Sequence, residues 1–166
     1  MTIPPGAADA ILSYVRKKAA EWTPEEVAIR ISAAVSELET AARAVAPELL
    51  DVRAAGQEWS PLECLRHAAE VNTGTAARVR GVVTDGRIPD EVPSVPKARE
   101  AILEAQASVI AGATAAVREG HGDPEAAITW LHPFLGELNW REWFLTIRVH
   151  SLDHARQLPA LQRAGS

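Results

Sequence analysis

The feature that most restricts the fold is a set of long segments in which apolar residues recur at steps of three and four. In the segment 23–46, positions 27, 31, 34, 38, 41 and 45 are all valine, isoleucine, leucine or alanine. This spacing places the apolar side chains along one face of an α-helix for six turns. Pro47 follows and predicts the end of this helix, because proline cannot continue one.

Two of the predicted helices have well-marked starts. Thr23 and Ser60 can each cap a helix; a proline follows each of them, and a glutamate stands three residues after each. In such a capping box the hydroxyl accepts from a first-turn N–H and the glutamate accepts from the N–H of the cap. We therefore expect helices at 24–46 and at 61–83, joined by a connection at 47–58.

The remaining segments are less regular. We expect a short leading helix at 11–22 and a third long helix at 96–119. The segment 88–96 contains three prolines and is predicted to be a loop. The segment 120–139 is ambiguous: Asp123-Pro124 could open a short helix, and residues 128–131 could equally be extended. We expect a structured loop there, and no segment has a convincing strand pattern. Pro159 is expected to end or kink the last helix.

Four long helices without strands predict an all-α protein, a four-helix bundle. Two connections of about 12 to 20 residues exceed the roughly 2 to 8 residues of simple bundles, so long crossover loops are expected. A chain of 166 residues fits one domain, 1–166, with its bundle core at about 23–158.

Composition excludes several classes of partner. The net charge of -5 argues against a nucleic-acid-binding surface, which is normally basic. No stretch approaches 18 uninterrupted apolar residues, and the N-terminus lacks the apolar core of a signal peptide. The single cysteine, Cys64, allows no internal disulfide and fits a reducing compartment. We expect a cytoplasmic protein that binds neither nucleic acid nor membrane.

The last predicted helix places two histidines among apolar residues. Asn139 is a good N-cap, and Glu142 completes a capping box with it. One stripe of this helix then faces the interior. Its members, at steps of four, three, four and four, are Trp143, Ile147, His150, His154 and Leu158.

These two histidines predict a metal site. Side chains at i and i+4 lie about 6 Å apart on one face of a helix, so the imidazoles of His150 and His154 can converge on one ion. A single core histidine is more often a packing residue. Two buried imidazoles, however, leave several nitrogens that need partners, at about 1 to 3 kcal/mol each, and one cation satisfies two of them. The natural third ligand is His67, on the inner face of the predicted 61–83 helix.

Two neighbours of His67 are further candidates for the site. Cys64 could be a fourth ligand and close a structural zinc site, although an open site is favoured because small buried cysteines commonly only pack. Glu70, one turn after His67, could orient a ligand or act as a base. Its alternative, an ordinary exposed helix glutamate, is slightly favoured.

Other aromatic and histidine side chains have simpler interpretations. His132 could stand at a pocket edge, but a loop histidine that caps local backbone is favoured, and His121 is expected to be exposed. Trp140 and Trp143 could wall a substrate pocket, with core burial as the default. The motifs E-x-x-H, H-E-x-x-H and G-x-S-x-G are absent, which disfavours a di-iron centre, a zincin protease and a serine hydrolase.

Two stretches carry a family resemblance: WSPLECLRHAAEVN at 59–72 and HPFLGELNWREWFLTIRVHSLDHARQL at 132–158. Together they resemble the DinB/YfiT-like superfamily over about 27–158. Those proteins are four-helix bundles, often described as metal-dependent hydrolases, and include bacillithiol transferases and mycothiol-dependent maleylpyruvate isomerases. The resemblance implies a divalent ion, nickel or zinc, on His67, His150 and His154. It also implies a homodimer.

The expected function follows from an open three-histidine site. By resemblance, a low-molecular-weight thiol such as bacillithiol or mycothiol would be transferred to an electrophilic small molecule, or a small molecule would be hydrolysed. The alternative is a non-catalytic metal- or ligand-binding bundle in which the metal is structural. No catalytic residue is assigned, beyond the interpretation of Glu70 given above.

Overall fold

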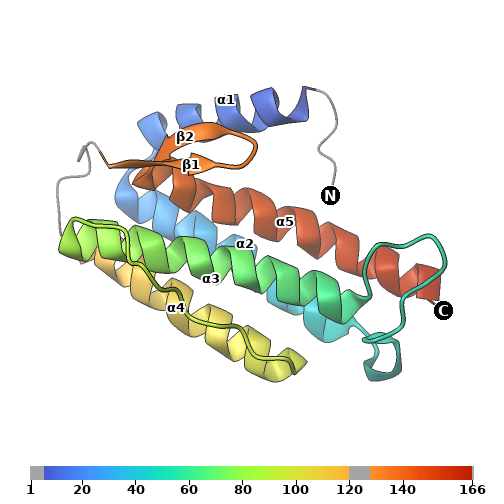
Figure 1. The fold of residues 1–166 in the computed structure, drawn as a ribbon. Coiled ribbons are helices and arrows are strands. Elements are labelled where there is room, and N and C mark those ends of the chain that lie inside the picture. The colour runs from blue at the N-terminus through green and yellow to red at the C-terminus, as the bar shows by residue number, and fades with distance from the viewer. Residues whose placement is uncertain (1–5, 120–127, 166) are drawn as a thin grey trace.

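The computed structural model describes residues 6–119 and 128–165, which are mostly helical (Figure 1). Its helices are α1 (Ala7–Glu21), α2 (Pro24–Ala44), the short 3-10 helix η1 (Pro47–Leu49), α3 (Pro61–Asp85), α4 (Arg99–Glu119) and α5 (Trp140–Gly165). Two short strands, β1 (Thr129–His132) and β2 (Gly136–Asn139), form an antiparallel hairpin. The helices α2 to α5 form a four-helix bundle, as predicted.

The predicted helix starts are confirmed. At α2 the Thr23 hydroxyl accepts from the Glu26 N–H at 3.2 Å, and the Glu26 carboxylate accepts from the Thr23 N–H at 2.8 Å. The same box opens α3, where Ser60 and Glu63 exchange bonds of 3.3 and 2.8 Å. Each box satisfies two backbone donors that a helix end would otherwise leave unpaired.

Helices α2 and α5 run parallel. At one end the Arg141 side chain donates to the Trp22 carbonyl at 3.4 Å, and at the other the Gln162 side chain accepts from the Ala46 N–H at 3.0 Å. Helix α4 runs antiparallel to α2, because Glu25 at the start of α2 pairs with Arg118 at the end of α4.

Helix α3 runs antiparallel to α5, since Cys64 lies against Gln157 and Asn72 lies against Ser151. Helices α3 and α4 are therefore parallel, and the connection 86–98 returns along the length of the bundle between them (Figure 1). This is the predicted crossover loop. Gly86, with φ of 64°, ends α3 in the left-handed conformation that glycine adopts without strain.

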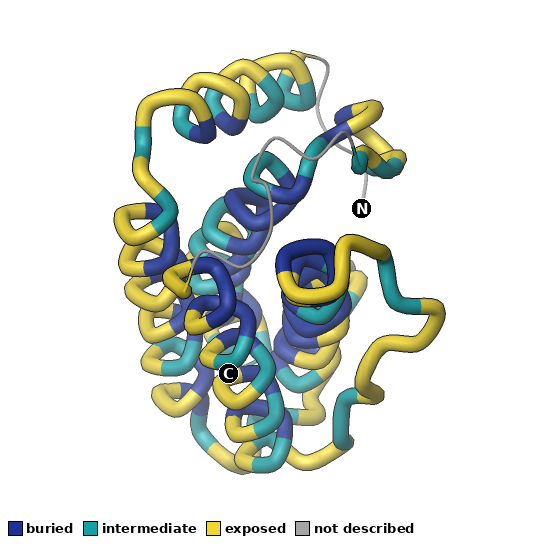
Figure 2. Tube along the Cα trace, turned by 90° about the vertical axis from the view of Figure 1, so that its left-hand side faces the viewer, coloured by how far each residue is buried: buried dark blue, intermediate teal, exposed yellow. Residues whose placement is uncertain are grey.

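The core consists of two apolar clusters on the faces that the helices turn toward one another (Figure 2). One cluster lies around α1, the hairpin and the first turns of α5, with Phe144 and Ile31 among its fully buried side chains. The other joins the end of α2, the start of α3 and the end of α5, with Leu38, Leu65 and Leu158. The second cluster lies beside the predicted site residues.

The structure differs from the sequence-based predictions at two places. The described part of the 120–139 segment is a hairpin and not the expected loop, although the extended alternative for 128–131 agrees with β1; residues 120–127 lie outside the described residues. Each strand has only four residues, too few for alternation to stand out. Pro159 does not end α5, which continues to Gly165. Leu158 and Leu161 are buried on either side of the proline, and their packing outweighs the missing hydrogen bond.

The third long helix begins at Arg99 and not at Pro96. Within residues 6–119 and 128–165, no helix is both long enough and apolar enough to cross a membrane.

Candidate metal centre

Antiparallel packing of α3 and α5 brings the three predicted histidines together. His67 lies near the start of α3, whose register is set by the Ser60 capping box. His150 and His154 lie one turn apart on α5. The start of α5 is fixed by Asn139, whose side chain accepts from the Glu142 N–H at 3.0 Å, while the Glu142 carboxylate accepts from the Asn139 N–H at 2.9 Å. Both capping boxes were predicted from the sequence.

The ligand atoms of the three imidazoles all lie within 4.8 Å of one another. The closest are the Nε2 atoms of His150 and His154, at 3.0 Å. The His67 ring centroid is 5.3 Å from those of both other histidines. His154 is fully buried, whereas His67 and His150 are partly exposed, so one side of this histidine cluster is open to solvent.

Trp59, the residue before the α3 cap, covers the cluster. Its ring lies 4.7 Å from that of His67, tilted by 34°, and 5.9 Å from that of His154. In the sequence, Trp59 stands out only as the first residue of the 59–72 motif. A tryptophan just outside a helix start is usually a packing residue, so its type and position gave no signal for a place at the site.

Two side-chain amides fix the imidazole protons. The Asn72 Oδ1 atom lies 3.2 Å from Nδ1 of His150, and the Gln157 Oε1 atom lies 2.8 Å from Nδ1 of His154. An amide oxygen can only accept, so Nδ1 of each ring is the donor and carries the proton. The two Nε2 atoms that face each other at 3.0 Å are therefore both unprotonated.

This arrangement fits a divalent cation. Two lone pairs at 3.0 Å repel each other unless a positive charge lies between them. Two nitrogens bound to one tetrahedral ion at about 2.1 Å are roughly 3.4 Å apart, a few tenths of an ångström more than the distance found here. The His67 ring packs against Trp59 and lies beside both rings of the pair, where it can supply a third nitrogen. Imidazole nitrogens are ligands that suit nickel and zinc.

Burial keeps the imidazoles neutral. It lowers the pKa of His150 to about 3, with the nearby His154, His67 and His132 acting in the same direction. Burial also lowers the pKa of His67 and of His154 below the usual value. At neutral pH the three rings are therefore in the uncharged form that a metal ion requires.

Cys64 lies on the far side of His154 from this cluster. Its Sγ atom is 3.4 Å from Nδ1 of His154 and 3.6 Å from Gln157 Oε1, to which the thiol donates. Burial raises the pKa of this thiol to about 12, so no thiolate forms at neutral pH. Among the described residues, the group of converging ligand atoms contains the three histidines without Cys64.

Glu70 does not contact the cluster through a hydrogen bond of the described residues. Its carboxylate is half exposed and pairs with Arg66, one turn earlier, at 3.0 Å. The ordinary surface interpretation of Glu70 is thus the one that its contacts support.

The remaining histidine and tryptophan candidates that the structure describes stabilise the fold and do not belong to the histidine cluster. His132 caps local backbone, as favoured from the sequence: its Nδ1 accepts from the N–H groups of Phe134 and Leu135, both at 3.2 Å. Trp140 and Trp143 are buried, and the Trp143 indole donates to the Trp130 carbonyl at 3.0 Å. His121 lies outside the described residues.

Asn72 and Gln157 were missed as site residues by the sequence analysis. An amide on a helix is common, and its spacing from a histidine carries no known motif. The available signal was burial: Asn72 falls on the inner face of α3, where a polar side chain needs a partner.

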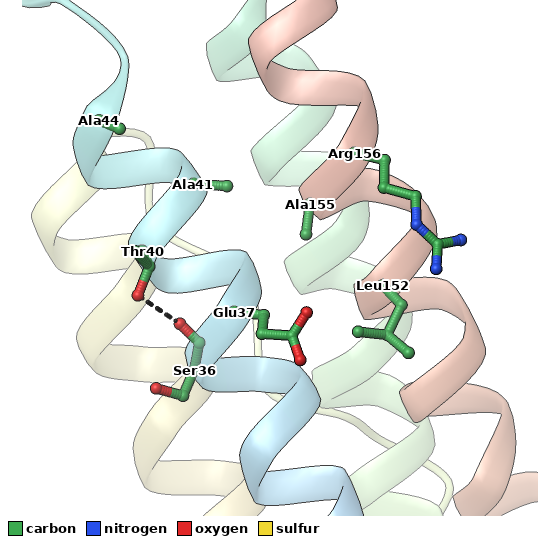
Figure 3. Close-up of a pocket in the computed structure, with 8 residues that line it drawn as sticks. All are labelled: Ser36, Glu37, Thr40, Ala41, Ala44, Leu152, Ala155 and Arg156. Atoms are coloured by element: carbon green, nitrogen blue, oxygen red, sulfur yellow. Dashed lines mark hydrogen bonds between the residues drawn. The ribbon is translucent and has the colours of Figure 1, made fainter.

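A groove of about 390 Å³ lies elsewhere, between α2 and α5 (Figure 3). On the α5 side it is lined by Leu152, Ala155 and Arg156. Leu152 lies two residues after His150, and Arg156 lies two residues after His154. Two residues correspond to a rotation of about 200° around the helix axis, so these side chains point away from the histidines. The groove is therefore on the opposite side of α5 from the histidine cluster and is not its substrate pocket.

Comparisons with known proteins show the family through one family model and support the fold through one solved structure. A family model described as the DinB superfamily matches residues 30–158. The crystal structure of TT2238, a four-helix bundle protein, is similar with a TM-score of 0.62 and 26% sequence identity, over 83% of this chain and 99% of that one. No curated protein matches the sequence.

The lowered pKa values predict an acid-sensitive metal-free protein. His150 stays neutral in the folded state down to about pH 3 but is protonated below about pH 6.5 once unfolded. Below pH 6.5 the unfolded state binds more protons, so the free energy of unfolding falls as pH falls. Between pH 7 and 5.5 we expect about 1 kcal/mol of loss from His150. Urea unfolding at the two pH values, with a chelator present to remove metal, measures this loss.

The control for this measurement is the His150→Gln variant, whose residue 150 cannot be protonated. Its free energy of unfolding should depend less on pH over the same interval, since the exposed carboxylates titrate alike in both proteins. Parallel profiles for the two proteins would show that burial does not hold His150 neutral.

Cys64→Ala separates a packing thiol from a ligand. The Sγ atom lies beside Nδ1 of His154 and not beside the converging Nε2 atoms, so zinc affinity should remain within about twofold of wild type. The lost packing should cost about 1 kcal/mol of unfolding free energy. Chelator competition and urea unfolding measure these two quantities. A drop in affinity of a hundredfold or more would place the thiol on the metal.

Proposed function

The chain belongs to the DinB superfamily, and on that premise we propose that it is a metal-dependent enzyme. One divalent ion, nickel or zinc, is held by His67, His150 and His154. The observation that carries the proposal is the pair of facing, unprotonated Nε2 atoms at 3.0 Å, with a third imidazole beside them. The acceptors on both Nδ1 atoms and the burial of the rings favour the same metal-binding form.

An open coordination position favours catalysis over a purely structural metal. Structural zinc sites are closed by four protein ligands, whereas catalytic sites have three and leave a place for water or substrate. Within the described residues the cluster offers three ligands. His67 and His150 are partly exposed, so a small molecule can approach on their side.

The nucleophile comes from outside the chain. Cys64, the only cysteine, is buried with its pKa raised to about 12, and Glu70 is engaged with Arg66 at the surface. A bound divalent ion would lower the pKa of a water or thiol that reaches it by several units, which supplies a nucleophile at neutral pH. The chain itself holds the three nitrogens, keeps them unprotonated and provides the Trp59 ring as an apolar wall.

We propose that this nucleophile is a low-molecular-weight thiol such as bacillithiol or mycothiol, transferred to an electrophilic small molecule. The other reaction that the same site supports is hydrolysis of a small molecule, in which water replaces the thiol as nucleophile. Support comes from the family, from the open side of the cluster and from the lack of a reactive thiol in the chain.

A second candidate function is a metal that only stabilises the bundle. It is favoured by the full burial of His154 and by Trp59, which lies over both His67 and His154. In that case the metal would raise stability without any turnover.

Metal content tests the site. Protein produced with added nickel and zinc, and purified without chelator, should contain about one ion per chain, and His150→Ala or His154→Ala should contain almost none. The matched control is His132→Asn, which changes a histidine of the hairpin outside the cluster. Elemental analysis measures all four proteins. Wild type without metal, or histidine variants that keep it, would refute the site.

Thiol conjugation tests the reaction. Metal-loaded protein is assayed with several thiols, bacillithiol and mycothiol among them, and the electrophile monochlorobimane, with ester hydrolysis in parallel. We expect conjugation above background with at least one thiol, lost in His154→Ala and kept in His132→Asn. Equal conjugation rates for wild type and His154→Ala, together with no ester hydrolysis, would refute the enzymatic function and favour a metal that only stabilises the bundle.

A further inference from the structure

A network of buried amides joins the histidine cluster to helix α4. Asn72 on α3, Gln106 on α4 and Ser151 on α5 are all fully buried, in a bundle whose interior is otherwise mostly apolar. The Asn72 Nδ2 atom donates to Gln106 Oε1 at 3.2 Å and to Ser151 Oγ at 3.0 Å. Buried polar groups are costly, so a network of three residues from three helices needs a reason.

The two donated bonds fix the direction of the Asn72 amide. Both Nδ2 hydrogens are used by Gln106 and Ser151, so Oδ1 is turned the other way, toward Nδ1 of His150 at 3.2 Å. Because Oδ1 only accepts, His150 must carry its proton on Nδ1. Its Nε2 is then left with a lone pair in the cluster.

The opposite direction would disable His150 as a ligand. If the amide of Asn72 were reversed, its NH₂ group would donate to Nδ1, and the proton of the neutral ring would move to Nε2. A protonated Nε2 has no lone pair for a metal ion. The direction of one hydrogen bond thus decides whether His150 can bind a metal.

Gln106 favours the observed direction. Among the described residues its buried Nε2 atom has no hydrogen-bond partner, so both amides could be reversed without breaking a bond to that atom. Reversal would pair this Nε2 with Asn72 Oδ1, but it would leave Gln106 Oε1 without a donor and one Asn72 hydrogen without an acceptor. The arrangement found here uses both hydrogens and the oxygen of the Asn72 amide and gives His150 its acceptor.

We propose that Asn72 is a positioning residue of the metal centre. Held by Gln106 and Ser151, it keeps His150 in the form protonated on Nδ1 and leaves Nε2 for a divalent ion. This inference rests on the proposed metal site, and it extends the site from the three ligands to a residue that touches one of them. Partners of this kind commonly contribute 10- to 100-fold to metal affinity.

Three variants test the inference through zinc affinity, measured by competition with a chromophoric chelator. Asn72→Leu removes the acceptor at nearly constant size, and affinity should fall about 10- to 100-fold. Asn72→Asp keeps an acceptor toward Nδ1, and affinity should stay within about threefold of wild type. The control is Thr73→Val, a buried neighbour whose hydroxyl bonds only within α3 and whose change should leave affinity unaltered. Circular dichroism checks the fold of each.

Wild-type affinity in a folded Asn72→Leu would overturn the inference and leave the metal site standing. Equal losses in the Leu and Asp variants would also overturn it, since they would indicate a structural role. Wild-type protein that binds no zinc would overturn both the inference and the proposed function.

A spectroscopic test needs no variant and decides the matter if Asn72→Leu does not fold. In zinc-loaded wild-type protein, long-range ¹H–¹⁵N correlation spectra report which nitrogen of each imidazole is protonated. We expect His150 to be protonated on Nδ1 and metal-bound through Nε2. Protonation on Nε2 would overturn the inference.

Discussion

The packing of α3 against α5 is the interaction on which the histidine cluster depends. Because the two helices run antiparallel, the first turns of α3 lie beside the middle of α5, and His67 comes to face His150 and His154. The crossover loop 86–98 then makes α4 parallel to α3, which sets Gln106 beside Asn72. The directions of these helices therefore bring together the three histidines and set Gln106 beside Asn72.

Burial of the imidazoles explains why the rings are neutral, and it also imposes a free-energy cost because buried ring nitrogens need partners. Removing three rings from water lowers the pKa of each, which favours the neutral form but leaves ring nitrogens in need of partners. Asn72 and Gln157 satisfy Nδ1 of two rings, and this leaves two lone pairs facing each other. A protein that used these residues only for packing would gain nothing from that arrangement.

The three histidines of the cluster were predictable from the sequence, and the residues that support them were not. His150 and His154 follow a helical spacing with a marked start, and His67 lies on the inner face of another capped helix, so local rules place all three. Asn72 and Trp59 act through contacts between helices, which no local pattern encodes. The hairpin was not predicted because its four-residue strands are too short for alternation to stand out. Helix α5 continues past Pro159 because the burial of Leu158 and Leu161 outweighs the local signal.

The burial of Cys64 has a consequence for the survival of the protein. A thiol whose pKa is raised to about 12 presents no thiolate at neutral pH, and its fully buried sulfur is closed to solvent. Alkylating agents and peroxides therefore find no reactive cysteine anywhere in this chain, which has only this one. A bundle built in this way can remain intact among the very electrophiles that would inactivate a protein with an exposed thiol.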